Sequence, residues 1–350
     1  MAKKKKSFLK KIFISLLVVL LLVGGYLGYQ LHSMIYQPNV TLHGKETDFL
    51  YIPTGSELKD VVNLLYEKNY VINRNSFEWW AEKKKYKTIK PGRYLIRADM
   101  SNDELIALLR SGEQVPINVI FNNIRLKQDL AGVIGRQLEA DSVKFLQLLS
   151  DEEIAIKYGF TAESFLCMFI PNTYEFYWNT SSEEFAEKIA KEYKKFWNDS
   201  RKKKAKKLNL TQTEVSVLAA IVQKETKMND EKPRVAGVYL NRLKKEMLLQ
   251  ADPTLIFALG KFDIHRVLNK HKKIDSPYNT YMHKGLPPGP ITLPEISSID
   301  AVLNSEQHDY LYFCAKSDFS GYHNFAKTYS QHKQNARKFQ RALNKKGVYK

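Results

Sequence analysis

A stretch of twenty uncharged residues at positions 12–31 constrains this chain more than any other feature. As a helix rising about 1.5 Å per residue, it is long enough to cross the hydrocarbon core of a bilayer. A cleaved signal peptide is the competing interpretation, but the run continues through Gly24, Gly25 and Gly28 without an Ala-x-Ala motif. We therefore expect an uncleaved anchor. Six lysines precede it: Lys3, Lys4, Lys5, Lys6, Lys10 and Lys11.

These lysines also predict the orientation, because basic flanks stay on the cytoplasmic side of a membrane. Residues 1–11 would be a cytoplasmic tail, and the chain after residue 32 would lie outside the plasma (inner) membrane, in the periplasm. The net charge is +18, and it is still +12 without the six lysines. A basic balance can indicate nucleic acid, but this location excludes that partner and favours anionic lipids or wall polymers. The basic run at 201–207 is typical of a solvated helix end or a linker.

The sequence lacks the motifs of several common kinds of functional site. Cys167 and Cys314 are far apart and show no metal-ligand spacing, so buried free thiols are expected rather than a zinc site or a disulfide framework. His323 and His332 are nine residues apart, and no H-E-x-x-H, G-x-S-x-G or P-loop motif occurs. We therefore expect no metal and no cofactor.

The ectodomain is expected to have an α+β fold. After a linker at 32–45, residues 46–115 read as a small α+β module. Strands are predicted at 48–52 and 93–96. Ser56 is predicted to cap a first helix, and a Ser101–Glu104 capping box is predicted to begin a second helix that ends at Gly112.

Residues 116–350 would form a larger, mixed α/β domain. It opens with a predicted strand at 117–121, and amphipathic helices are predicted at 126–138, 141–149 and 183–197. The aromatic segment 165–177 contains Pro171 and is expected to be an ordered loop.

A single carboxylate stands out in this larger domain. Thr211 and Glu214 form a capping box, and in the helix that follows Glu225 lies on the same face as Leu218, Ile221 and Val222. A carboxylate on a buried stripe is unusual, because its charged form is costly to remove from water. Two explanations stay open at this point. Glu225 is paired with a buried cation, or it is held partly protonated in a cleft. The candidate cations are Arg234 and Arg242.

Polar, aromatic and turn-forming loops follow this helix, and such loops supply sites more often than cores. Tyr278 and Tyr281 have flat faces suited to a sugar ring. Asn279, Thr280 and Gln250 can form hydrogen bonds to hydroxyl groups. Core packing is the alternative interpretation of each tyrosine.

Five of these segments, taken in order, resemble the endolytic murein transglycosylases of the MltG (YceG-like) family, and the match covers nearly the whole chain. The segments are 218–226, 249–254, 276–281, 285–291 and 323–325. The order of parts is similar too: cytoplasmic lysines, one anchor at 12–31, a LysM-like module at 46–115 and a catalytic domain at 116–350. Gln223 stands where the family often has a first glutamate, so Glu225 alone matches the catalytic position.

The resemblance implies cleavage of the β-1,4 bond between N-acetylmuramic acid and N-acetylglucosamine in nascent glycan strands. It leaves 1,6-anhydro ends and terminates strand elongation. Glu225 would act as acid and base. The substrate would be held by Asn241, Arg242, Gln250, Asp252, Thr254, Tyr278, Asn279, Thr280, Tyr281, Leu286, Pro287, His323 and Phe325.

Two other functions are weighed against this one. A muramidase-type hydrolase needs a second carboxylate, for which Asp252 is the candidate, although the Asp-Pro pair also reads as a turn. A non-catalytic, membrane-anchored scaffold that binds peptidoglycan is the alternative outside enzymes. The expected partners are peptidoglycan strands, the membrane through the N-terminal helix, and peptidoglycan synthases.

Overall fold

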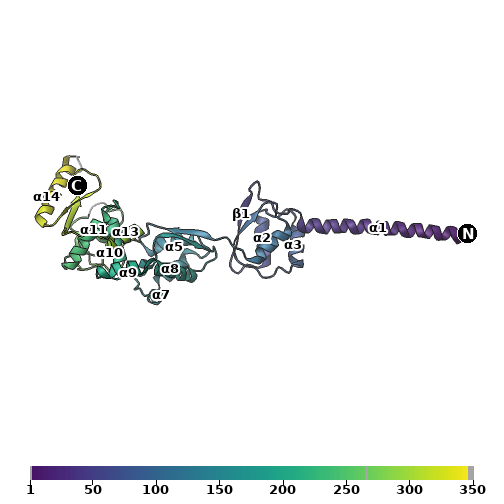
Figure 1. The fold of residues 1–350 in the computed structure, drawn as a ribbon, viewed down its shortest axis with the longest axis horizontal. Coiled ribbons are helices and arrows are strands. Elements are labelled where there is room, and N and C mark those ends of the chain that lie inside the picture. Colours follow the sequence, from purple (N-terminus) through teal and green to yellow (C-terminus); the bar gives the residue numbers. More distant parts are fainter. Residues whose placement is uncertain (1, 265–266, 346–350) are drawn as a thin grey trace. The chain divides into compact units, whose positions relative to one another are not determined.

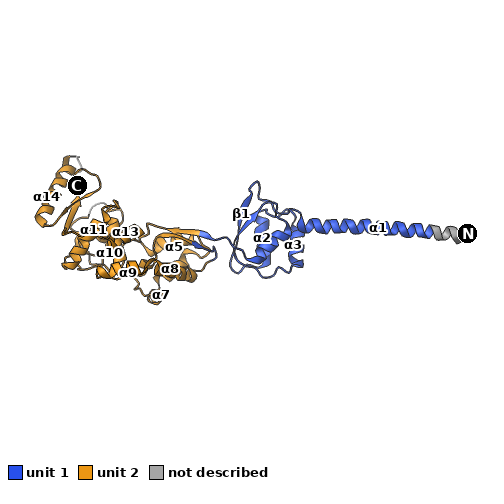
Figure 2. Ribbon diagram, in the orientation of Figure 1, with its two compact units in different colours: residues 1–117, 175–179 blue, residues 118–174, 180–350 orange. Residues whose placement is uncertain are grey.

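The computed structural model describes residues 2–264 and 267–345, with side chains from residue 8 onward. The lysines at positions 3–6 therefore lie outside the described side chains. The chain divides into two compact units (Figure 2), of which unit 1 holds residues 1–117 and 175–179, and unit 2 holds the rest. The fold is α+β, as predicted, with helices and three two-stranded sheets among the described residues.

Unit 1 begins with one long helix, α1 (Ala2–Tyr36). Its span Phe8–Tyr36 has a mean hydropathy of 2.4, and its side chains are exposed throughout the most apolar window. Exposed apolar side chains in such numbers need a nonaqueous surrounding. The helix is therefore compatible with a membrane anchor. It extends beyond the predicted 12–31 on both sides.

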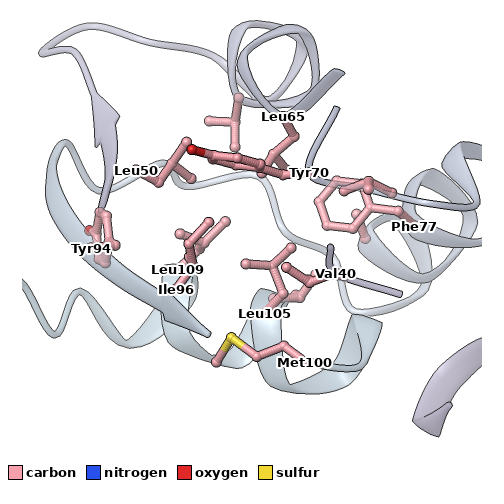
Figure 3. Packing of buried hydrophobic residues seen from close by; sticks show 14 of the residues in the cluster. Val40, Leu50, Leu65, Tyr70, Phe77, Tyr94, Ile96, Met100, Leu105 and Leu109 are labelled. Atoms are coloured by element: carbon pink, nitrogen blue, oxygen red, sulfur yellow. The ribbon is translucent and has the colours of Figure 1, made fainter. Parts of the chain in front are cut away.

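The globular part of unit 1 contains an antiparallel pair, β1 (Thr47–Ile52) and β2 (Gly92–Arg97), in which Thr47 lies opposite Arg97. The pair confirms both predicted strands. Figure 3 shows apolar side chains of these strands and the neighbouring helices meeting in one core. The helices are α2 (Leu58–Glu67), α3 (Arg74–Lys83) and α4 (Asn102–Ser111).

The start of α4 confirms the predicted capping box, since Ser101 and Glu104 each accept the other's backbone N–H. Gly112 ends the helix at φ 75°, in the left-handed region that favours glycine. The prediction that Ser56 caps α2 is wrong. The N-cap is Glu57, which forms its own box with Asp60.

The segment predicted as a linker at 32–45 is part of the folded unit. Helix α1 continues to Tyr36, and isolated bridges join Pro38 to Ser101 and Val40 to Val71. Val40 and Leu42 are buried in the core. The prediction was wrong here because these few residues carry no periodicity of their own and are ordered only by the partners they meet.

The chain from residue 117 to 207 is mostly helical and contains a second two-stranded sheet of β3 and β4. The aromatic segment at 165–177, predicted as an ordered loop, contains η1 and β4. The basic run at 201–207, predicted as a solvated helix end or a linker, lies within α9. The elements are β3 (Ile117–Phe121), α5 (Lys127–Gly135), α6 (Ser142–Ser150), α7 (Glu152–Lys157), η1 (Phe165–Met168), β4 (Asn172–Phe176), α8 (Ser182–Phe196) and α9 (Asp199–Lys207).

The remainder of unit 2 is built around α10, which packs against α11 and α13 (Figure 1). Apolar residues of these three helices form one buried cluster. The strands β5 and β6 form an antiparallel hairpin with Tyr312 opposite Ala326. The elements are α10 (Gln212–Glu225), α11 (Lys232–Lys244), α12 (Asp252–Leu259), η2 (His271–Lys273), α13 (Ile296–Leu303), β5 (Tyr312–Ala315), β6 (His323–Ala326) and α14 (Tyr329–Lys345).

Candidate active site

Glu225 is the last residue of α10, and the chain turns into extended backbone at Thr226, with φ −139°. The predicted Thr211–Glu214 capping box is present at the start of the same helix. The Glu225 side chain is only partly accessible. Tyr239 of α11 donates a hydrogen bond of 2.6 Å to its Oε1. The carboxylate therefore lies at a helix end, at a boundary between core and solvent.

The two cations considered as partners for Glu225 are engaged elsewhere. Arg234 forms an ion pair of 2.9 Å with Glu306. The buried Arg242 donates hydrogen bonds of 2.7 Å to the carbonyl oxygens of Leu249 and Leu311. Within the described part of the chain, neither arginine lies in ion-pair contact with Glu225. Of the two explanations left open by the sequence, the structure favours the protonated carboxyl.

Electrostatics support this interpretation. Burial raises the pKa of Glu225 from an ordinary value of 4.5 to about 7. The Tyr239 hydrogen bond and the charge of Arg242 oppose the shift, while the charge of Asp252 adds to it. A carboxyl group with such a pKa exchanges its proton near neutral pH.

Asp252 does not form a simple turn with Pro253; the pair begins α12. Proline is tolerated in the first turn of a helix, where its missing N–H has no partner to lose. Tyr281 donates a 2.5 Å hydrogen bond to Oδ1 of Asp252, which is otherwise exposed. The charge of Asp252 raises the pKa of Glu225, and the charge of Glu225 raises the pKa of Tyr281. Asp252 and Tyr281 therefore both lie within electrostatic reach of Glu225.

Three residues predicted to hold substrate are instead used to shape the loop. Asn279 is fully buried and donates to the carbonyl oxygens of Lys272 and Ile274. The buried hydroxyls of Thr254 and Thr280 lie 2.8 Å apart. These side chains are buried and already hydrogen-bonded within the loops, so their observed contacts shape the loops.

Other predicted residues of these loops differ in exposure. Gln250 is exposed at φ 50°, and its backbone N–H donates to the Thr280 carbonyl. Tyr278 is half-buried, with its ring 4.7 Å from that of Phe257. Leu286 packs against the α10 core, and Pro287 is buried. Gln250 is therefore accessible, Tyr278 is partly accessible, and Pro287 is buried within the loop.

The last three predicted residues lie in or beside the β5–β6 hairpin. Asn241 donates to the carbonyl oxygens of His308 and Tyr310 ahead of β5. Phe325 and His323 of β6 both contact the ring of Phe313, which in turn contacts Tyr239 edge-on at 5.9 Å. His323 and Phe325 are therefore connected to Tyr239, the partner of Glu225, through the ring of Phe313. Asn241 holds the chain ahead of β5.

Sequence reasoning missed two residues of the site. Tyr239 lies on the buried face of α11, four residues after Val235, and a hydroxyl at such a position needs a partner. Glu231 is 3% exposed and accepts hydrogen bonds from the Thr226 hydroxyl, the His323 backbone N–H and His323 Nδ1. It thereby ties the turn after Glu225 to β6.

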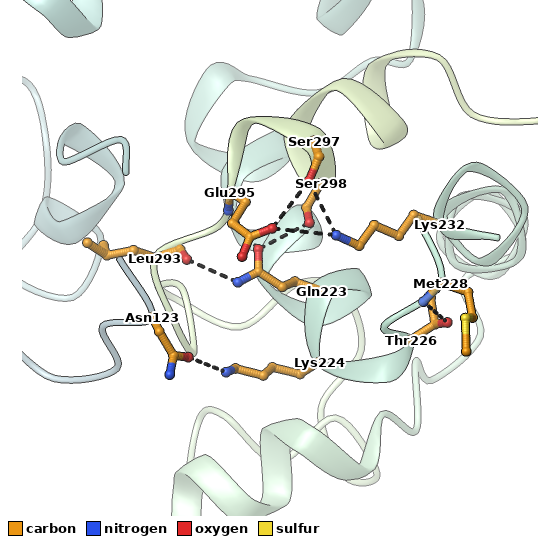
Figure 4. Close-up of polar contacts among 10 residues, drawn as sticks. All are labelled: Asn123, Gln223, Lys224, Thr226, Met228, Lys232, Leu293, Glu295, Ser297 and Ser298. Carbon is orange, nitrogen blue, oxygen red and sulfur yellow. Dashed lines mark hydrogen bonds and ion pairs between the residues drawn. The ribbon is translucent and has the colours of Figure 1, made fainter. Parts of the chain in front are cut away.

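Gln223, where the family often has glutamate, has a structural role. Its Oε1 accepts a 2.6 Å hydrogen bond from the Glu295 backbone N–H and another from the Ser298 hydroxyl (Figure 4). These donors lie at the start of α13, whose first N–H groups lack helical partners. Gln223 therefore caps α13, and no contact joins it to the Glu225 carboxyl among the described residues.

Neither a disulfide nor a metal cluster is formed where the chain is described. Cys167 is a buried free thiol, as expected, and Cys314 is free but only partly buried. In the same residues no group of three His, Cys, Asp or Glu side chains is placed to hold a metal ion.

Comparison with known proteins connects this two-unit α+β fold to cell-wall proteins. The chain is 30% identical over 345 residues to a Bacillus subtilis (strain 168) protein named endolytic murein transglycosylase, with 93% of each chain covered. A Streptococcus pneumoniae (strain D39) protein of the same name is 28% identical, and 88% of this chain spans 62% of it. The crystal structure of a YceG-like protein from Listeria monocytogenes matches with a TM-score of 0.55 at 27% identity, over 83% of this chain and 99% of that one.

The model of the YceG-like family matches residues 50–338, which include parts of both units. The chain belongs to the YceG-like family.

Proposed function

We propose that this protein is an endolytic murein transglycosylase that cuts the β-1,4 bond between N-acetylmuramic acid and N-acetylglucosamine in nascent strands. It leaves 1,6-anhydro ends and so terminates strand elongation. The observation that carries the proposal is Glu225, a carboxyl group with a pKa of about 7, held by Tyr239 at the rim of the α10 core. The names of the relatives agree with this activity.

The proposed chemistry begins with protonated Glu225, which gives its proton to the glycosidic oxygen as the bond to C1 breaks. The sugar then carries oxocarbenium character, and Glu225 is a carboxylate stabilised by the Tyr239 hydroxyl. The carboxylate takes the proton of the C6 hydroxyl as its oxygen attacks C1 of the same residue. No water is consumed, and Glu225 ends the cycle protonated.

The accessible polar and aromatic groups around Glu225 are the proposed substrate contacts. These are Asp252, Tyr281, Tyr278 and Gln250, all at least partly accessible. Asp252 begins α12 and accepts a hydrogen bond from Tyr281, while the other three lie on loops. Arg242 lowers the pKa of Glu225 through its charge and fixes the chain around Leu249 and Leu311. Asn241, His323 and Phe325 support the hairpin beside the site.

The finer aspects of location follow from the sequence. We infer that α1 anchors the chain in the plasma (inner) membrane with its lysine-rich end in the cytoplasm, and that both globular parts act in the periplasm. The unit 1 module is proposed to be LysM-like. Peptidoglycan synthases that extend the strands are proposed as neighbours in the membrane.

Two experiments test the activity. Purified full chain in detergent is incubated with uncrosslinked glycan strands, and shortening is followed by chromatography and mass spectrometry. Wild-type protein should give ends one water lighter than hydrolysis gives. Glu225→Gln should lower the rate by about a thousandfold or more while retaining the fold, and normal cleavage by this variant rejects the role of Glu225.

The muramidase alternative has one observation in its favour, because the charge of Asp252 is felt at Glu225. A second carboxylate can activate a water or form a covalent intermediate. Reducing ends only, without anhydro ends, would establish that chemistry. Binding without any shortening would establish a scaffold.

A further inference from the structure

A small cavity lies beside the end of α10, apart from the residues proposed to act on the glycosidic bond. Its volume is about 100 Å³. Lys224, the neighbour of Glu225, and Pro253, the neighbour of Asp252, both line it. The cavity therefore lies at the same two helix ends that carry Glu225, at the end of α10, and Asp252, at the start of α12.

The lining of this cavity combines apolar and cationic side chains. Ile256, Phe257, Phe262 and Ile291 contribute the apolar lining, and Arg125 and Lys224 are the charged lining residues. An engineered cavity of about 150 Å³ accepts benzene. A space of this size therefore admits a methyl-bearing group of a few atoms but not a hexose ring.

The two cations line the same small cavity, and the charge of Arg125 acts on Lys224. The Arg125 guanidinium stacks on the Phe262 ring at 4.6 Å, and Lys224 Nζ makes a long hydrogen bond of 3.4 Å to Asn123, drawn in Figure 4. Among the residues that the structure describes, no carboxylate lies within 4.0 Å of either cation, and Glu295, whose charge reaches Lys224, lies against Lys232 instead.

This arrangement disfavours the charged form of Lys224. Burial lowers the pKa of Lys224, the charge of Arg125 lowers it further, and Glu295 only partly offsets these effects. Two like charges brought together at an apolar surface repel each other and are stabilised when an anion binds between them. The cavity therefore combines a space for a small apolar group with a site for one negative charge.

We propose that Arg125 and Lys224 form a subsite for a carboxylate carried on the lactyl substituent of the muramic acid at the cleaved bond. This inference rests on the proposed function and specifies its substrate. Murein differs from an unsubstituted hexosamine polymer in this substituent, which bears alanine methyl groups and peptide carboxylates, or a single lactyl carboxylate when the peptide has been removed. The apolar lining takes the methyl group and the cations take the carboxylate, so the enzyme selects anionic, substituted strands.

The test compares three glycan preparations of equal length with the full chain in detergent. The first retains its stem peptides, the second is stripped by an amidase and exposes the lactyl carboxylate, and the third is stripped and converted to the neutral methylamide. For each, kcat/KM is measured by chromatography of the products. Wild-type protein should favour one anionic preparation over the neutral one by about tenfold or more, as expected for charge-assisted hydrogen bonds.

Two variants and one matched control test whether Arg125 and Lys224 cause the preference for anionic strands. Arg125→Met and Lys224→Met should each reduce the ratio of anionic to neutral kcat/KM by about tenfold. Lys227→Met removes an exposed lysine two residues beyond Glu225 and should keep the wild-type ratio. Because the readout is a ratio within each variant, a general loss of activity cancels.

The outcomes separate the two proposals. A preference for peptide-bearing strands assigns the stem carboxylate, and a preference for stripped anionic strands assigns the lactyl carboxylate. Equal rates on all three strands in wild type, or an unchanged preference in both variants, overturn the subsite. If wild-type protein cleaves none of the preparations, it is the proposed function that fails.

Discussion

The phenolic oxygen of Tyr239 lies 2.6 Å from Oε1 of Glu225 and joins α11 to the end of α10. Burial alone would raise the pKa of the carboxyl further, and this hydrogen bond opposes that shift by favouring the ionised form. The pair therefore sets the carboxyl near neutrality, where one group can both donate and recover a proton.

Replacement of Tyr239 by phenylalanine should change the pH profile of cleavage. Without the hydroxyl, the pKa of Glu225 rises and the alkaline limb of kcat/KM should move upward by roughly one pH unit, with a loss of about tenfold at the optimum. Tyr322→Phe, whose hydroxyl meets the exposed Asp230, is the control and should leave the profile in place. An unshifted limb in Tyr239→Phe would mean that the hydroxyl does not act on Glu225.

The same carboxyl predicts a pH dependence of stability. Because its folded-state pKa of about 7 exceeds the ordinary 4.5, its contribution to stability is full below pH 4.5 and is lost as the pH rises through 7. Glu225→Gln removes this dependence. In urea unfolding, the free energy of unfolding of the variant relative to wild type should increase by on the order of 2 kcal/mol from pH 5 to pH 8. A difference that stays constant with pH would contradict a raised pKa.

Glu231 should be a large contributor to the stability of unit 2. Glu231→Ala leaves the His323 backbone N–H and the Thr226 hydroxyl without their acceptor, at a cost of about 3 kcal/mol. Asp230→Asn, at the exposed neighbouring position, should change the free energy of unfolding by less than about 0.5 kcal/mol. Chemical denaturation measures both, and similar small effects would show that Glu231 does not hold the turn.

The boundary of unit 1 can be tested by truncation. A chain that begins at residue 37 keeps Val40 and Leu42, and one that begins at residue 46 loses both from the core. Burial of two such side chains contributes about 4 kcal/mol. The shorter chain should therefore unfold at a clearly lower temperature in calorimetry. Equal melting temperatures of the two chains would show that residues 37–45 act only as a linker.

Elements with local signals can be predicted from the amino-acid order alone. The apolar run that became α1, the capping boxes at Ser101 and Thr211, and the strands of unit 1 depend on side chains a few residues apart. The helical position of Glu225 on an apolar face was also evident, because periodicity places residues on a face without knowledge of the partner.

The contacts of each of these residues are known only from the packed fold. The sequence could not choose between a cation and a proton as the partner of Glu225, nor find Tyr239 fourteen residues away on another helix. It also could not separate accessible Gln250 from buried Asn279, since both are polar residues in loops. Exposure and pKa depend on contacts between distant segments, and these contacts exist only once α10, α11 and the loops after them have packed together.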